Sequence, residues 1–157
     1  MQTAVLPEGL CRIGAGAFSD CVKLLRVAVP NQIQFLENRV FRGCRALQEV
    51  SLPEGLCRIG ESAFYGCTGL KKLALPESLV YIGKMAFYRA GLREVRIPAK
   101  TAVVESLAFA KSPVQKAWIS GGGDTGKAYG AGIFRDCMKL KLLFLEEGAC
   151  HIPDQFA

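Results

Sequence analysis

Apolar and polar positions recur along the chain at a fixed interval of 23 residues. Two sets of residues share this spacing, four phenylalanines and four prolines: Phe18, Phe41, Phe64, Phe87, Pro7, Pro30, Pro53 and Pro76. The nine-residue string LPEGLCRIG also occurs twice, at 6–14 and 52–60. Self-similarity at a period of this length predicts a repeat architecture, in which each unit packs mainly on its two neighbours.

The whole chain, 1–157, is predicted to form one domain of six repeats and a fragment. Counted from the proline, the repeats are 7–29, 30–52, 53–75, 76–97, 98–119 and 120–145, with a partial one at 146–157. We number them one to six in this order. The fourth and fifth are one residue short, and the sixth contains the insertion GGGDTG at 121–126.

Each repeat contains three pieces with different periodicity. The segment 70–76, LKKLALP, alternates at its end and predicts a short strand ended by proline. The string GLCRIG predicts a second extended piece with Leu56 and Ile59 pointing inward, and ESAFYGC predicts one helical or 3-10 turn that buries Ala63 and Phe64. Stacking these units about 4.8 Å apart would give a β-rich, α/β-type solenoid with short parallel strands.

The predicted core consists of the apolar residues at equivalent places in successive repeats. In repeat three they are Leu56, Ile59, Phe64, Cys67, Leu70, Leu73 and Leu75. Their predicted equivalents elsewhere include Leu10, Ile13, Phe18, Leu24, Val27, Val29, Ile33, Leu36, Phe41, Leu47 and Val50.

The repeats share the motif LPxxLxxIGxxAFxxCxxLxxVxLP, which resembles the BspA-type leucine-rich repeat of bacterial surface proteins and some parasitic protists. The match is closest in repeats one, three and four, whereas repeat two has Phe35, Leu36 and Glu37 in place of a CRIG-like run. The resemblance implies a right-handed, curved leucine-rich-repeat superhelix that binds or adheres to host or matrix proteins at a cell surface or after secretion. It implies no enzyme activity and no cofactor.

Two features of the composition bear on location. The N-terminus, MQTAVLPEGL, lacks the basic and apolar regions of a signal peptide, so a cytoplasmic location stays open beside the one that the resemblance implies. The longest apolar runs are only a few residues, so we expect no insertion into a membrane.

The seven cysteines are predicted to form two columns of free thiols. Cys21, Cys44, Cys67 and Cys137 occupy the FxxC position, where parallel stacking points their β-carbons the same way and favours buried thiols over disulfides. The second column, Cys11, Cys57 and Cys150, precedes Arg12, Arg58 and His151 and is expected to be more exposed. No CxxC string is present, so we expect no zinc site.

The variable positions of the LxxVxL strand are the candidate binding site. Over the six repeats these positions hold seven basic and two acidic residues, in a chain whose net charge is +6. On a concave sheet they would form a basic and aromatic patch suited to a protein partner, an acidic one above all, with nucleic acid or an anionic glycan as less favoured ligands. The candidate ligand-binding residues are Lys72, Arg93, Arg96, Lys116, Trp118, Lys141 and Phe144. These positions could equally be solvated strand positions without a ligand.

Two other functions are compatible with the sequence. The insertion and the residues after it, Gly121 to Lys127, match the GxxxxGK part of a phosphate-binding loop, but Ala128 follows where Mg²⁺ coordination needs Ser or Thr. The chain could also be a structural spacer in a longer array, and its apparently uncapped ends would permit end-to-end self-association. The single histidine, His151, has no partner for a catalytic triad.

Overall fold

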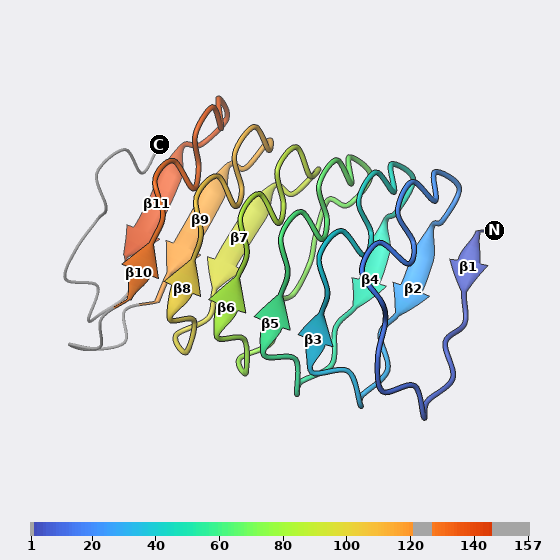
Figure 1. Cartoon of the computed structure of the whole chain (residues 1–157). Coiled ribbons are helices and arrows are strands. Elements are labelled where there is room, and N and C mark those ends of the chain that lie inside the picture. The colour runs from blue at the N-terminus through green and yellow to red at the C-terminus, as the bar shows by residue number, and fades with distance from the viewer. Residues whose placement is uncertain (1, 121–126, 146–157) are drawn as a thin grey trace.

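The computed structural model describes residues 2–120 and 127–145, and the chain winds through them as a solenoid of about six repeats (Figure 1). One side, here called the long-strand face, contains β1 (Thr3–Ala4), β2 (Arg26–Ala28), β4 (Glu49–Ser51), β7 (Glu94–Ile97), β9 (Lys116–Ile119) and β11 (Leu142–Leu145). The opposite short-strand face contains β3 (Phe35–Leu36), β5 (Arg58–Ile59), β6 (Tyr81–Ile82), β8 (Val103–Val104) and β10 (Ala128–Tyr129). Every strand pair is parallel, as the repeat pattern predicts.

The two faces differ in continuity. On the short-strand face the five strands form one sheet in the order β10-β8-β6-β5-β3. On the long-strand face there are two three-stranded sheets, β1-β2-β4 and β11-β9-β7. The residues between them, 71–75, form no strand, so the strand predicted at 70–76 is wrong. The polar and apolar alternation of this segment is regular, and it does not reveal the interruption.

A column of phenylalanine rings runs through the core along the solenoid axis. Its members are Phe18, Phe41, Phe64, Phe87, Phe109 and Phe134, with neighbouring ring centroids 5.0 to 5.4 Å apart and nearly parallel planes. All but Phe18 are buried. Because each ring is covered by the rings of its two neighbours, the column is one continuous apolar contact across the repeats.

Most of the predicted core residues are buried, but five are only partly buried: Leu10, Phe18, Val50, Leu73 and Leu75. Leu10 and Phe18 belong to the first repeat, which is covered by a complete repeat on one side only among the described residues. The other three flank the interruption of the long-strand face. Burial therefore follows the contacts between repeats, which the apolar pattern alone does not specify.

The segments around each phenylalanine form chains of turns, and no helix occurs in the part of the chain that the structure describes. The predicted helical or 3-10 turn is therefore not confirmed. Two residues in every repeat have a left-handed backbone, one two places before the phenylalanine and one two places after it. They are Gly16, Arg39, Ser62, Met85, Leu107, Gly132, Asp20, Gly43, Gly66, Arg89, Lys111 and Asp136. Such residues interrupt a right-handed helix.

The backbone of the same segments is hydrogen-bonded between repeats. The N–H of Phe41 donates to the carbonyl oxygen of Ala63 at 2.8 Å, and that of Phe64 donates to Ala86 at 2.7 Å. In a helix these N–H groups would donate four residues back along the same segment. The turn segments thus join neighbouring repeats much as the strands do, and they form a third side of the solenoid.

Candidate binding surface

The late repeats bring the predicted aromatic residues together on the long-strand face. Strand register aligns Arg96 of β7 with Trp118 of β9, and Trp118 with Phe144 of β11. Side chains alternate between exposed and buried along β7, so Arg96 faces outward while Val95 and Ile97 enter the core. These three side chains form one column because the parallel strands pair with no shift in register.

The column is a stack of flat groups. The rings of Trp118 and Phe144 have centroids 5.2 Å apart and planes within 9° of each other. The guanidinium carbon of Arg96 lies 5.3 Å from the centroid of the Trp118 ring, in a cation–π position. Phe144 remains 40% exposed. The stack therefore presents an ordered amphipathic surface. Because its side chains are already held by one another, they would lose little further conformational entropy when a ligand binds.

The basic character of this face is reduced by ion pairs. Lys116 Nζ lies 3.6 Å from a carboxylate oxygen of Glu94, its register neighbour on β7. On β2 and β4 the pair Arg26 and Glu49 is 3.3 Å apart. Both pairs are largely exposed, so each contributes little to stability. Each pair nevertheless neutralises one of the seven basic residues at the variable positions of these strands.

Three candidate residues remain: Arg93 and Lys141, which share a column, and Lys72, which lies elsewhere. The carbonyl oxygen of Arg93 accepts from Gln115 N–H at 2.7 Å, and that of Gln115 accepts from Lys141 N–H at 2.9 Å. Arg93 and Lys141 therefore lie in one column at the start of these strands, and both are exposed. The column of Glu94, Lys116 and Leu142 lies between them and the aromatic stack. Lys72 lies in the segment without a strand and is not part of this group. Six of the seven predicted residues are thus brought together.

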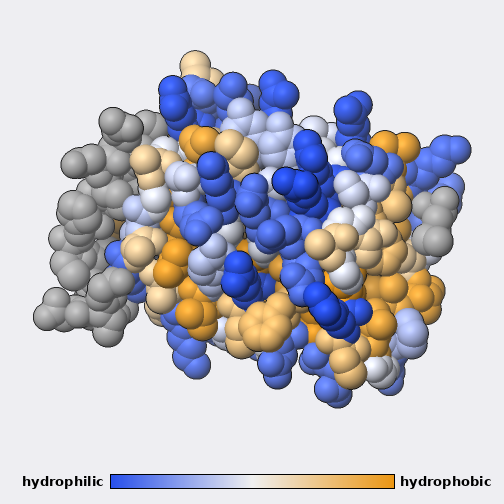
Figure 2. Space-filling model, in the orientation of Figure 1, coloured by the Kyte–Doolittle hydropathy of each residue, from blue (hydrophilic) through white to orange (hydrophobic). Residues whose placement is uncertain are grey.

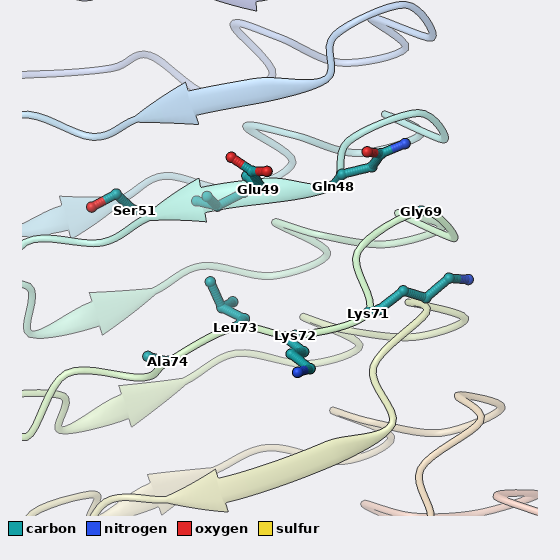
Figure 3. Close-up of a pocket in the computed structure, with 9 residues that line it drawn as sticks. Gln48, Glu49, Ser51, Gly69, Lys71, Lys72, Leu73 and Ala74 are labelled. Atoms are coloured by element: carbon teal, nitrogen blue, oxygen red, sulfur yellow. The ribbon is translucent and has the colours of Figure 1, made fainter.

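A cleft opens where the long-strand face is interrupted, between β4 and the segment of repeat three (Figure 3). Its volume is about 620 Å³, and Val50 and Leu73 give it an apolar lining. Lys71 lies at one end, where its ammonium group donates to the carbonyl oxygen of Thr68 at 2.8 Å. Nothing in the sequence indicates this cleft, because repeat three matches the motif as well as any other.

Of the P-loop-like segment Gly121 to Lys127, the structure describes only Lys127. Residues 121–126 lie outside the described ranges, as do Cys150 and His151. Lys127, the residue that a phosphate-binding loop would direct at phosphate, donates to the carbonyl oxygens of Ala99 at 2.9 Å and Ser120 at 2.6 Å. Partial burial lowers the pKa of this ammonium group. The ammonium group of Lys127 is therefore hydrogen-bonded to the protein backbone at two places.

The first cysteine column is buried from repeat two onward. The thiols of Cys44, Cys67 and Cys137 donate to the carbonyl oxygens of Phe18, Phe41 and Phe109 at 3.0 to 3.2 Å. Ser112 occupies the same place in repeat five and donates to Phe87 at 2.8 Å. Cys21 is exposed, and its predicted burial is wrong, since no earlier phenylalanine carbonyl lies over it. In the second column Cys11 is exposed and Cys57 is half-buried.

Thiol reactivity should follow this division. Burial raises the pKa of Cys44 to about 12 and of Cys137 to about 11, and it raises that of Cys67 as well. At about pH 8 we expect Cys11 and Cys21 of the folded protein to be alkylated readily, and the three buried thiols only after unfolding. Mass spectrometry of alkylated peptides, with and without urea, measures this. Equal labelling of Cys67 and Cys11 without urea would contradict it.

Two further observations limit the chemistry of the described residues. Among residues 2–120 and 127–145, no group of three His, Cys, Asp or Glu side chains is arranged so that it could hold a metal ion. The same residues include no helix of the length and apolar character needed to cross a membrane.

Comparison with known proteins identifies similar sequences and structures. A family model described as the BspA type leucine rich repeat region matches residues 1–115 in six copies. The crystal structure of a leucine-rich repeat protein from T. pallidum matches with a TM-score of 0.81 and 29% identity, over 97% of this chain and 78% of that one. No curated protein matches the chain in sequence.

Two more solved structures share the fold at lower identity. A leucine-rich repeat protein from Bacteroides ovatus matches with a TM-score of 0.71 and 21% identity, over 99% of this chain and 52% of that one. The pneumococcal vaccine antigen PcpA matches with a TM-score of 0.69 and 20% identity, over 100% of this chain and 34% of that one. The chain therefore spans about half and a third of the length of these two proteins.

Proposed function

Because the chain belongs to the BspA-type leucine-rich repeat family, we propose that it is a non-enzymatic module that binds a protein ligand on its long-strand face. Leucine-rich repeat proteins generally serve in protein interaction or as structural elements. The observation that carries the proposal is the stack of Arg96, Trp118 and Phe144, because exposed aromatic and arginine side chains are enriched in binding hot spots.

The chemistry of the surroundings favours an acidic ligand surface. Arg93 and Lys141 contribute exposed positive charge at the start of the strands that carry the aromatic rings, whereas Glu94 already neutralises Lys116. A ligand with an apolar centre and a carboxylate rim would cover the rings and pair with these cations. The proposal places the protein at a cell surface, and the similarity to a protein described as a vaccine antigen supports that location.

A triple variant tests the site. We expect Arg96→Glu and Lys116→Glu combined with Trp118→Ala to weaken ligand binding by about tenfold or more, since both the ring and the charge complementarity are lost. The fold should persist, because all three side chains lie on the solvent side of β7 and β9. Pull-down from extracellular and cytosolic fractions of the native environment, quantified by mass spectrometry, measures the loss.

A matched control changes the short-strand face instead. Phe35→Ala with Arg58→Glu removes an exposed ring and reverses one charge far from the stack. Proteins retained by this control and lost by the triple variant support the site. Proteins retained equally by both variants would place binding elsewhere, and capture only from the cytosolic fraction would contradict the proposed location.

A structural spacer is the second candidate, and one observation favours it. On β11 the side chains of Leu143 and Leu145 are 36% and 43% exposed, whereas their register partners Ala117 and Ile119 are buried. A further repeat unit or a second copy could cover them, which would permit end-to-end association. A pull-down that captures nothing above background with the unmodified chain would favour this function over ligand binding.

A further inference from the structure

The third side of the solenoid, formed by the turn segments, has a row of basic and aromatic side chains. We call it the turn-edge row. It contains the residue after the core phenylalanine in repeats two, three, four and six, and the second left-handed residue of repeats four and five: Arg42, Tyr65, Tyr88, Arg135, Arg89 and Lys111. All are exposed or half-exposed. Hydrophilic side chains are seen along the upper edge of the molecule, over the turn segments (Figure 2).

Within the row, flat groups and cations follow one another along the solenoid axis. The guanidinium carbon of Arg42 lies 5.3 Å from the centroid of the Tyr65 ring, and the Tyr65 and Tyr88 rings stack at 5.1 Å with planes 11° apart. Lys111 Nζ lies 5.9 Å from the centroid of the Tyr88 ring. The two tyrosines are therefore enclosed between cations of repeats two and five.

Hydrogen bonds between repeats fix the spacing of this row. Gly43 N–H donates to the carbonyl oxygen of Tyr65, and Gly66 N–H donates to that of Tyr88, both at 2.8 Å. Lys111 N–H donates to the carbonyl oxygen of Arg135, also at 2.8 Å. The step from one side chain to the next is thereby set at about 5 Å by the parallel backbone. A ligand would meet a preorganised linear array.

Within the part of the chain that the structure describes, the cations of the row form no ion pairs. No carboxylate there pairs with Arg42, Arg89, Lys111 or Arg135. On the two strand faces, by contrast, carboxylates pair with Arg26, Lys116 and Arg12 at 3.3 to 3.6 Å. The acidic residues of the left-handed positions occur only in the first and last complete repeats, as Asp20 and Asp136. The middle of the row is therefore a strip of uncompensated positive charge.

We propose that the turn-edge row binds an anionic polysaccharide, a chain of sulfated or carboxylated sugars lying along the solenoid axis. A linear polymer with regularly spaced negative groups matches a linear strip of cations, and the tyrosine hydroxyl groups can hydrogen-bond to sugar hydroxyls. This surface and this ligand class are separate from the long-strand face and its protein ligand.

The geometry distinguishes this ligand from other polyanions. Single-stranded nucleic acid binds through bases that stack on aromatic faces. Here the faces of Tyr65 and Tyr88 cover each other and are covered on their outer sides by Arg42 and Lys111. An acidic protein would use an apolar anchor as its centre, and the row consists of cations and phenol rings. A sugar chain needs neither a free ring face nor an apolar pocket.

The experiment measures binding of the full chain to heparin, a sulfated glycosaminoglycan, at about 0.15 M salt and at higher salt. Arg89→Gly with Lys111→Gly is the test variant, because glycine occupies the same left-handed position in repeats two and three, as Gly43 and Gly66. We expect it to bind heparin about 10-fold to 30-fold more weakly, with a smaller dependence on salt. Adding Arg42→Ser should weaken binding further, since Ser19 occupies that position in repeat one.

The matched control removes two cations elsewhere, through Arg58→Ala and Lys100→Ala. Arg58 lies on β5 and Lys100 in an exposed loop, so net charge falls equally while the row is intact. Unchanged heparin binding by this control supports the proposal. An equal loss in both variants, no binding at physiological salt, or equal binding to heparin stripped of its sulfate groups would overturn it. Tighter binding to single-stranded DNA that depends on the same residues would overturn the choice of a polysaccharide.

Discussion

Replacing Phe64 with alanine is expected to lower the free energy of unfolding by about 3–5 kcal/mol. The Phe64 side chain is fully buried and stacks between Phe41 at 5.3 Å and Phe87 at 5.2 Å. Alanine would remove apolar area from the core and leave a cavity that the neighbouring rings cannot fill, because backbone hydrogen bonds between repeats fix their separation. Urea unfolding, followed by circular dichroism, measures the change.

Phe35→Ala is the matched control for this measurement. Phe35 is also a phenylalanine of the solenoid, but it lies on β3 and is 54% exposed. We expect its replacement to change the free energy of unfolding by only about 0.5 kcal/mol. A loss below about 1 kcal/mol for Phe64→Ala, or equal losses for the two variants, would show that the phenylalanine column is not the main apolar contact between repeats.

Adding a single methyl group at Gly91 should be the second large effect, a loss of about 2–3 kcal/mol. A β-carbon at this position would overlap the carbonyl group of Thr68 in the preceding repeat and lie 3.1 Å from the carbonyl oxygen of Leu70. Both obstacles are backbone, and Gly91 N–H is itself held at 3.0 Å from the carbonyl oxygen of Cys67. Gly91→Ala therefore forces two repeats apart, and urea unfolding reports the cost.

Gly9→Ala provides the comparison without a clash. No heavy atom lies within 4 Å of a β-carbon built at Gly9, and its backbone is not left-handed. Alanine there should leave stability unchanged or raise it by up to about 1 kcal/mol, since it restricts the unfolded chain. Equal stability of Gly91→Ala and Gly9→Ala would contradict the prediction. It would mean that repeats three and four can move apart at Gly91 without loss of stability.

The sequence by itself determined the repeat, the family and most of the core. A residue that recurs every 23 positions must occupy the same place in every layer of a parallel stack, so the Phe64 column follows from counting alone. The grouping of Trp118 with Phe144 was predictable for the same reason. Residues at equivalent positions of adjacent repeats become neighbours, because the parallel strands pair without a shift in register.

Only the tertiary structure decided how the backbone runs within a layer and which charges meet between layers. The left-handed residues around each phenylalanine replace a helical turn, and the apolar pattern is the same for either conformation. The interruption beside Leu73 and the pairing of Lys116 with Glu94 depend on distances of a few ångströms between neighbouring repeats. Periodicity specifies which residues share a column, but the direction and spacing of the backbone decide what each side chain touches.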